Sequence, residues 1–332
     1  MLLGHGSGGR LSAELLRAVF LPALGNELLN ELEDQATVRI GDGLRLAFTT
    51  DSYVVRPLFF PGGDIGKLAV NGTVNDLAVG GARPLALSAA FILEEGLPLA
   101  HLQCVNESMR RACKESGVKI VTGDTKVVDR GKCDGMFITT TGIGIVPNDV
   151  SLSVHNARSG DHVIVSGTVG DHGIAVMSVR EGLEFETTLE SDCAPLADLT
   201  RAMLDACPTI RFMRDPTRGG LAGALNELAT GSKVGLKLTE KSIPLRPETR
   251  AACELLGLDP LYVACEGRLV AVVPPYDAER VLGVMRRHPL GRGAAMIGTV
   301  VSEHPGTVTI RTQIGGERVV PLLAGDQLPR IC

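Results

Sequence analysis

The chain has 332 residues, of which 44% are hydrophobic and 21% are charged, and its net charge at pH 7 is −5. The length favours two domains and the apolar fraction supports a folded core, while the negative charge and the absence of Trp argue against a nucleic-acid partner. No apolar run approaches the roughly 20 residues of a membrane span, and N-terminal glycines interrupt any signal peptide. Eight cysteines without a Cys-x-x-Cys pair predict reduced thiols and therefore a cytoplasmic protein.

Strand-like and helix-like stretches alternate along the chain, which predicts an α/β (α+β) protein. In the first half, strands are expected over 44–55, 84–93, 118–121 and 136–146, and helices over 64–79 and 99–116. Asp64 is the expected N-cap of the helix 64–79, and Gly80 is its stop. The turn residues Pro147-Asn148-Asp149 predict a boundary near 148–158, which divides an N-terminal domain (1–150) from a C-terminal domain (151–321).

The second half repeats the alternation. Strands are expected over 162–165, 234–238, 268–273, 295–301 and 307–312, and helices over 173–181, 196–206, 221–229, 248–256 and 278–287. Gly231 is the expected stop of the third of these helices. Residues 322–332 contain Gly325 and Pro329 and have no periodicity, so they are expected to form a mobile tail.

The N-terminal run Gly4-His5-Gly6-Ser7-Gly8-Gly9-Arg10 matches G-x-G-x-x-G, the dinucleotide-binding pattern. Only three residues precede it, however, whereas that pattern needs a preceding strand. Residues 62–68 similarly lack the spacing and the hydroxyl of a Walker loop. The exposed backbone amides and the arginine of the N-terminal run still suit phosphate oxygens. The run is therefore either a phosphate-binding loop or a flexible terminus.

Four aspartates lie at strand ends or beside glycines, where α/β proteins place ligand groups; they are Asp51, Asp64, Asp124 and Asp215. Each one alone is also compatible with an ordinary turn. Asp76 differs, because it falls on the apolar face of the helix 64–79, where an unpaired carboxylate is unfavourable. It needs either a basic partner or a metal ion. The number of strand-end carboxylates favours Mg²⁺, which prefers oxygen ligands.

Two segments combine groups suited to an anionic substrate. Gly123-Asp124-Thr125-Lys126 joins an acid to an ammonium group, although Lys126 also fits a solvated turn. Asp215-Pro216-Thr217-Arg218-Gly219-Gly220 precedes a predicted helix and resembles an anion site at a helix N-terminus.

Two further residues are candidate bases. His172, in Gly170-Asp171-His172-Gly173, is either a base or part of a helix cap. Glu266 interrupts two apolar stretches and is either a general base or part of a strand-end turn.

The chain ends in Pro329-Arg330-Ile331-Cys332. A prenylation box needs its cysteine four residues from the end, so this is not one. A free thiol at the tip of a mobile tail oxidises readily. Cys332 therefore either has a function or stands there by chance.

Taken together, these segments resemble the HypE family, the carbamoyl dehydratases of nickel–iron hydrogenase maturation. The resemblance spans essentially the whole chain. It is carried by His5-Gly6-Ser7-Gly8-Gly9, Asp51-Ser52-Tyr53, Phe60-Pro61-Gly62-Gly63, Asn75-Asp76, residues 91–96, residues 121–128, Gly170-Asp171-His172-Gly173, residues 214–220 and the terminal Pro-Arg-Ile-Cys. The terminal motif and Thr-Gly-Asp-Thr-Lys are specific, whereas the glycine loops belong to the wider superfamily of aminoimidazole ribonucleotide synthetase and selenophosphate synthetase.

The resemblance implies a fold and a reaction. It implies two α/β domains of the aminoimidazole ribonucleotide synthetase type, a homodimer formed through the N-terminal domains, and ATP in the cleft. The partner HypF attaches a carbamoyl group to the terminal thiol, here Cys332. ATP then drives dehydration of the thiocarboxamide to a thiocyanate, and the cyanide passes to iron on a HypC–HypD complex.

The resemblance also implies roles for the residues above. Cys332 carries the substrate, Lys126 stabilises the transferring phosphoryl group, and Glu266, with His172 as second choice, takes the protons. Mg²⁺ is expected at Asp51, Asp64, Asp76 and Asp124. The residues expected at ATP are Gly6, Ser7, Gly8, Gly9, Arg10, Asn75, Asp215, Thr217, Arg218 and Gly219.

Two alternatives stay open at this point. One is a related enzyme that phosphorylates a diffusible, amide-like small molecule, for which Cys332 is dispensable. The other is a carrier without ATP hydrolysis, in which the aspartates are structural.

Overall fold

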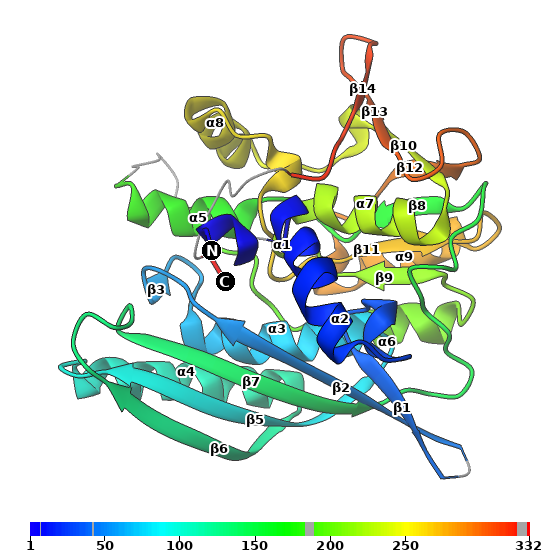
Figure 1. Ribbon diagram of the computed structural model, residues 1–332. Coiled ribbons are helices and arrows are strands. Elements are labelled where there is room, and N and C mark those ends of the chain that lie inside the picture. Colours follow the sequence, from blue (N-terminus) through cyan, green and yellow to red (C-terminus); the bar gives the residue numbers. More distant parts are fainter. Residues whose placement is uncertain (7, 42, 183–188, 324–330) are drawn as a thin grey trace.

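The computed structural model describes residues 1–6, 8–41, 43–182, 189–323 and 331–332, which form two sheets with their flanking helices (Figure 1). The strands are β1 (Ala36–Ile40), β2 (Leu44–Tyr53), β3 (Phe59–Phe60), β4 (Gly63–Asp64), β5 (Arg83–Glu94), β6 (Lys119–Val128), β7 (Met136–Ile145), β8 (His162–Val165), β9 (Phe212–Arg214), β10 (Gly235–Thr239), β11 (Val270–Val273), β12 (Ala295–Val301), β13 (Val308–Arg311) and β14 (Glu317–Val319). The α-helices are α1 (Arg10–Leu15), α2 (Leu21–Leu24), α3 (Ile65–Val79), α4 (Leu99–Ser116), α5 (Asp171–Arg180), α6 (Ala197–Ala206), α7 (Gly220–Ser232), α8 (Pro247–Leu256) and α9 (Ala278–Arg287).

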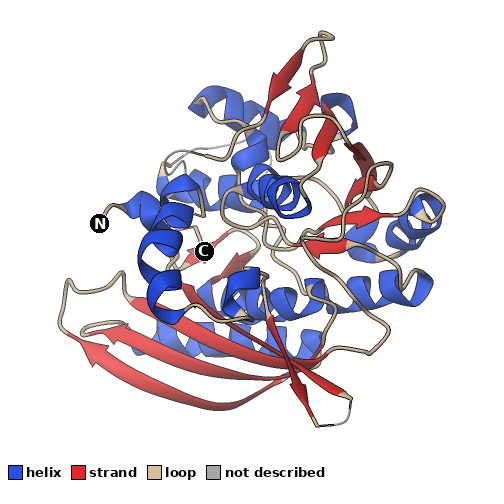
Figure 2. Ribbon diagram, turned by 45° about the vertical axis from the view of Figure 1, so that its right-hand side comes forward, coloured by secondary structure: helices blue, strands red, loops and turns tan. Residues whose placement is uncertain are grey.

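The first sheet has the order β1-β2-β7-β5-β6, and its neighbours are antiparallel except for the parallel pair β5–β6. Helices α3 and α4 cover one face of this sheet, and no described element covers the opposite face (Figures 1 and 2). A Cβ atom at Gly66 would lie 2.6 Å from the carbonyl oxygen of Val105, so only glycine permits this approach of α3 to α4. β6 forms the edge of the sheet, and nearly all of its residues are exposed.

Helix α3 lies between the first sheet and the second half of the chain. It contacts β2 and β7 on one side and α6 on the other, which explains why almost all of its residues are buried. Asp64 caps it as predicted, because its Oδ1 accepts hydrogen bonds from the backbone nitrogens of Gly66 (2.7 Å) and Lys67 (3.2 Å). Any polar side chain on α3 is therefore held between the two halves of the molecule.

The second sheet has the order β14-β13-β10-β12-β8-β11-β9. The central strands β8 and β11 consist almost entirely of buried aliphatic residues. Helix α7 packs on one face of this sheet, and α6 and α9 pack on the other. β8 and β11 therefore form the buried centre of the sheet, and β9, which pairs with β11, leads into the loop between β9 and α7.

The observed sheets and helices confirm the predicted mixed α/β class, with three local differences. Helix α7 continues through Gly231 and ends at Ser232, and its C-cap Lys233 has a left-handed φ of 54°. Strand β6 runs to Val128 although the apolar pattern stops at Val121, because an exposed edge strand needs no apolar face. Strands β1, β3, β4, β9 and β14 and the helices α1 and α2 were not predicted. Most of the predicted tail, 324–330, lies outside the described residues.

All eight cysteines are free thiols. Within the ranges that the structure describes, no helix is long and apolar enough to cross a membrane.

Candidate active site

Three carboxylates meet where the two halves of the chain face each other. Asp34 precedes β1, Asp76 lies on α3 and Asp215 follows β9, and one oxygen of each lies within 4.8 Å of the others. Burial, and then the charges of Asp215 and Asp34, raise the pKa of Asp76 well above its ordinary value. Burial and the charge of Asp34 likewise raise the pKa of Asp215. This acidic cluster therefore resists full ionisation unless a cation joins it.

The donor set of the acidic cluster fits Mg²⁺. Asp76 was predicted to need a cation, but its side chain accepts a hydrogen bond from the hydroxyl of Thr49 (2.9 Å), and no ion pair involves it among the described residues. Asp215 Oδ2 is buried and lacks a hydrogen-bond partner among the residues that the structure describes. Carboxylate oxygens converging on one point are the ligands that Mg²⁺ prefers.

The sequence analysis missed Asp34, which lies in the polar segment 31–35 and follows neither a strand nor a glycine. The guanidinium of Arg214 fixes it, with Nε 2.8 Å and Nη2 2.7 Å from Asp34 Oδ1. Arg214 is itself buried at the end of β9. The residues around Asp34 in the sequence give no sign of this contact, because its partner Arg214 lies 180 residues further along the chain.

Arg218 interacts with Asp51 and with the end of the chain. Its Nη2 lies 3.5 Å from Oδ1 of Asp51 on β2. Cys332, Asp51 and Glu266 all raise the pKa of its guanidinium, and Cys332 has the largest effect. The structure thus brings Cys332, Asp51 and Glu266 together around the positively charged guanidinium of Arg218.

A cavity of about 300 Å³ opens beside Arg218. It is lined by His5, Gly6, Gly8, Ser12, Asp34, Arg214, Asp215, Pro216, Thr217, Arg218, Gly220, Ala224 and Glu227. The N-terminal run and the β9–α7 loop, both predicted anion sites, therefore line one cavity. Gly219, also predicted here, is the left-handed N-cap of α7.

Not every residue of the N-terminal run lines this cavity. Arg10 is exposed and pairs with Glu14 (3.7 Å), and a Cβ atom at Gly9 would lie 2.6 Å from the carbonyl oxygen of Leu323. Ser7 lies outside the described residues.

Replacing Gly8 by Ala is expected to reduce ATP-dependent activity at least tenfold. Gly8 has a φ of +74°, which costs an L-residue about 1–2 kcal/mol, and its new Cβ atom would lie 3.0 Å from Cβ and O of Arg218. Gly131→Ala is the matched control, because Gly131 has a similar φ of +79° and nothing lies within 4 Å of its Cβ position. ATP consumption by the two variants is the measurement. Equal losses of ATP consumption in the two variants would show that the close approach of Gly8 to Arg218 is not needed for activity.

The last two residues are docked between the halves of the chain, where the C-terminus lies in Figure 1. The backbone nitrogen of Val54, just after β2, donates to the carboxylate of Cys332 (3.0 Å), and His172 Nε2 lies 2.7 Å from the carbonyl oxygen of Ile331. The Ile331 side chain is 4% exposed and belongs to an apolar cluster against which Cys332 packs. The terminal thiol is therefore brought to the neighbourhood of Arg218.

Glu266 is buried beside these groups. Its Oε1 has no hydrogen-bond partner among the described residues. Burial, and then the charges of Asp215 and Asp51, raise the pKa of Glu266 well above its ordinary value. A carboxylate with an unused oxygen and a raised pKa suits proton transfer.

Asn75, predicted to bind ATP, makes hydrogen bonds to backbone groups of the second half of the chain. Its Nδ2 donates to the carbonyl oxygens of Ala194 and Glu266 (3.1 Å each), and its Oδ1 accepts from the nitrogen of Leu196 (2.8 Å). The side chain holds the Glu266 backbone in place.

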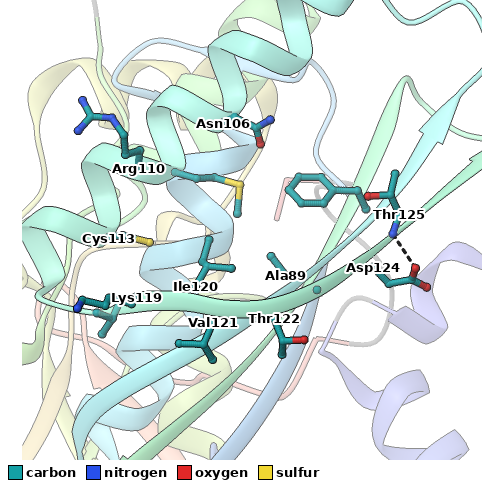
Figure 3. A pocket seen from close by; sticks show the side chains of 14 residues that line it. Ala89, Asn106, Arg110, Cys113, Lys119, Ile120, Val121, Thr122, Asp124 and Thr125 are labelled. Atoms are coloured by element: carbon teal, nitrogen blue, oxygen red, sulfur yellow. Dashed lines mark hydrogen bonds between the residues drawn. The ribbon is translucent and has the colours of Figure 1, made fainter.

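Asp124 and Lys126 lie away from the acidic cluster. They pair with each other on β6 (2.5 Å), with side chains 62% and 68% exposed. Asp124 lines a cavity of about 1000 Å³ between β6, β5 and α4 (Figure 3), whose lining contains no residue of the acidic cluster. Asp64 is used as the cap of α3.

Comparisons with known proteins identify the family of the chain. Two family models match the chain: "AIR synthase related protein, N-terminal domain" over residues 32–146, and "AIR synthase related protein, C-terminal domain" over residues 158–311. The "Carbamoyl dehydratase HypE" of Azotobacter vinelandii is 56% identical over 328 residues, which cover 99% of this chain and 96% of the relative. The protein of the same name from Escherichia coli (strain K12) is 46% identical over 334 residues, covering 99% and 98% of the two chains.

Solved structures give the same result. The chain in a "HypE-HypF complex" has a TM-score of 0.88 and 47% identity, with 93% of this chain and 99% of that chain covered. A "Hydrogenase Maturation Protein HypE in complex with ATP" has a TM-score of 0.85 and 48% identity, with 100% and 99% covered. A thiamine monophosphate kinase from Aquifex aeolicus shares the fold at 21% identity and a TM-score of 0.66. The protein has the predicted two-domain AIR synthase-like fold and belongs to the HypE family of carbamoyl dehydratases.

Proposed function

We propose that this protein is an ATP-dependent carbamoyl dehydratase whose substrate is its own S-carbamoylated Cys332, and that the resulting thiocyanate supplies the cyanide ligand for the iron of a nickel–iron hydrogenase. Membership of the HypE family supports this function, and a relative has been solved with ATP. The observation that carries it is the docking of Ile331 and Cys332 beside Arg218, next to Glu266 and the acidic cluster.

The reaction needs a leaving group and a base, because a carboxamide oxygen leaves poorly. Transfer of the γ-phosphoryl group of ATP to that oxygen releases ADP and makes phosphate the leaving group. The C–O bond then breaks as the nitrogen loses its two protons, which leaves S–C≡N. Glu266, with its unused Oε1, accepts a proton, and Arg218 offers its positive charge to the phosphoryl group.

Asp34, Asp76 and Asp215 are the residues that would hold Mg²⁺, with Asp51 close by across Arg218. When bound there, Mg²⁺ neutralises phosphate charge, as it does in other phosphoryl transfers. The N-terminal run and the β9–α7 loop line the cavity next to Asp215, where the same phosphates would lie.

The terminal cysteine also requires partners. A free thiol is mostly protonated at neutral pH, so it needs an activated carbamoyl donor such as the partner HypF supplies. The relative solved with HypF supports this partner. The thiocyanate must then meet an acceptor of cyanide, for which we propose the HypC–HypD complex. Eight free cysteines are consistent with a cytoplasmic location.

We further propose a homodimer formed through the uncovered face of the first sheet. The exposed residues of this sheet include Phe48 (47%), Ile92 (41%) and Val121 (65%), an apolar surface that a second copy would bury. Asp124 and Lys126 lie on the same sheet. Because both residues lie away from the acidic cluster of their own chain, their predicted roles at Mg²⁺ and at the phosphoryl group require that they reach the active site of the second copy.

The experiment is intact mass spectrometry of the protein incubated with HypF, carbamoyl phosphate and ATP. The expected result is a carbamoyl adduct that loses one water, with both species absent in Cys332→Ala. Cys104→Ala is the matched control, because Cys104 is an exposed thiol elsewhere in the chain. An adduct that never loses water would indicate a carrier. ATP consumption without any adduct would indicate a diffusible substrate.

A further inference from the structure

We infer that His172 is a positioning residue that latches the C-terminal segment into the cleft through its hydrogen bond to the backbone of Ile331. The inference rests on the proposed function, in which Cys332 must alternate between a carbamoylating partner and this cleft. It concerns how the docked state is held, which the chemistry at Glu266 and the acidic cluster does not address.

The contacts of His172 identify it as the latch. It lies in the first turn of α5, fully buried, with Nε2 2.7 Å from the Ile331 carbonyl oxygen and Nδ1 2.8 Å from Ser191 Oγ. The ring of Phe60 packs edge-on against the imidazole at a centroid distance of 5.3 Å. His172 thus connects α5, the 189–196 loop and the end of the chain.

The hydrogen-bond directions define one tautomer. The Ile331 carbonyl can only accept, so Nε2 carries the proton and donates it. Nδ1 is then an acceptor, and the Ser191 hydroxyl donates to it, while Ser191 Oγ accepts from the backbone nitrogen of Cys193 (3.1 Å). Every polar atom of this short relay is satisfied, which holds the imidazole in the orientation that faces Ile331.

These contacts favour positioning over proton transfer by His172. Both ring nitrogens are occupied while the tail is docked, and the partner of Nε2 is a main-chain carbonyl rather than a group that releases protons. Burial also lowers the pKa of His172 to about 4, so the neutral ring is the form present at neutral pH.

Removing the Nε2 donor is expected to weaken docking specifically. The buried carbonyl of Ile331 would lose its partner in the docked state, whereas water would satisfy it once the tail leaves. The second anchor, from Val54 to the Cys332 carboxylate, and the apolar contacts of Ile331 would remain. The balance between docked and undocked tails should therefore shift by about tenfold without loss of the fold.

The first test is the rate at which a carboxypeptidase removes Cys332, followed by intact mass, with neither ATP nor HypF present. His172→Phe keeps a packed ring but has no donor, and it is expected to lose Cys332 about tenfold faster than the unmodified protein. His172→Gln, whose amide can donate at a similar position, is expected to restore most of the protection. His155→Phe is the control. His155 also contacts a main-chain carbonyl, that of Gly231 (3.0 Å), but its site is exposed and does not involve the C-terminal segment.

The second test separates the two half-reactions. Carbamoylation by HypF, which needs an undocked tail, should be unchanged or faster in His172→Phe. Water loss from the purified carbamoylated variant should be about tenfold slower, and His172→Gln should recover it. A base at this position would instead make the Gln variant as slow as the Phe variant, which would overturn the inference.

An unchanged carboxypeptidase rate in His172→Phe, with the same thermal unfolding as the unmodified protein, would also overturn it. Failure of the unmodified protein to lose water would count against the proposed function alone, because the carboxypeptidase comparison uses no substrate and still decides whether His172 holds the tail.

Discussion

Replacing Glu266 by Gln is expected to slow water loss from the carbamoylated protein by roughly 10²–10⁴-fold and to leave carbamoylation of Cys332 unchanged. The substitution preserves the shape of the buried side chain but removes its ability to accept a proton. Glu266 is suited to this role because its Oε1 has no partner in the described part of the chain. The measurement is single-turnover water loss by intact mass, started by adding ATP to purified carbamoyl adduct.

Glu254→Gln is the matched control, since Glu254 lies at an exposed position on α8. Equal rates for the Glu266→Gln variant and the unmodified protein would exclude Glu266 as the base. The adduct itself should form in both variants, which separates this outcome from a failure of HypF to act.

The rate of water loss should also depend on pH in a defined direction. Burial and the neighbouring carboxylates raise the pKa of Glu266 well above 4.5, and only the ionised form accepts a proton. Activity should therefore fall as the pH decreases through this raised pKa, at a higher pH than an ordinary glutamate would impose. The residual activity of Glu266→Gln should lack this decrease.

Replacing Asp215 by Asn is expected to reduce ATP-dependent water loss by at least a hundredfold and, in the absence of Mg²⁺, to stabilise the protein. Activity falls because one of the three carboxylates of the acidic cluster is lost. Stability rises because the repulsion of Asp215 with Asp34 and Asp76 is removed, by on the order of 2 kcal/mol in the free energy of unfolding. Urea denaturation with EDTA and with Mg²⁺ measures the second effect.

The pH dependence of this stability follows from the raised pKa of Asp76 and Asp215. Between 3.8, their value in an unfolded chain, and their raised values, the folded state binds more protons than the unfolded state. The metal-free protein should therefore lose stability as pH increases through this window. Mg²⁺ should restore the most stability at the upper end of the window, where the loss is greatest. Asp215→Asn should flatten both effects.

Asp205→Asn is the control for this variant, because Asp205 is exposed on α6. Equal stabilisation by Mg²⁺ of Asp215→Asn and of the unmodified protein would contradict a metal site in the acidic cluster.

Several elements of the fold could be predicted because their signals are local. Helix α3 begins at Asp64 and α4 ends at Gly117, where a capping carboxylate and a left-handed glycine act within a few residues. The short strands β9 and β14 were missed because three residues carry no recognisable alternation. Helix α7 passed through a glycine stop because burial against the second sheet outweighs the modest propensity cost of Gly231.

The candidate site was predicted only in part, for the same reason. Asp76 was singled out because a carboxylate on an apolar helix face is anomalous within the helix itself. Asp34 was not, because its importance comes from Arg214, 180 residues further along the chain. Asn75 was placed at ATP from its motif, whereas its amide is occupied by backbone groups about 120 and 190 residues away.

By itself the sequence determined the mixed α/β class, the main helices, the anomalous Asp76, the glycine-rich runs and the terminal thiol, since each depends on spacing or chemistry within one segment. Only the tertiary structure decided that Asp34 joins Asp76 and Asp215, that Glu266 Oε1 has no hydrogen-bond partner among the described residues, and that His172 meets Ile331 across 159 residues. Such contacts depend on how the two halves of the chain pack, and packing is a property of surfaces assembled from distant segments.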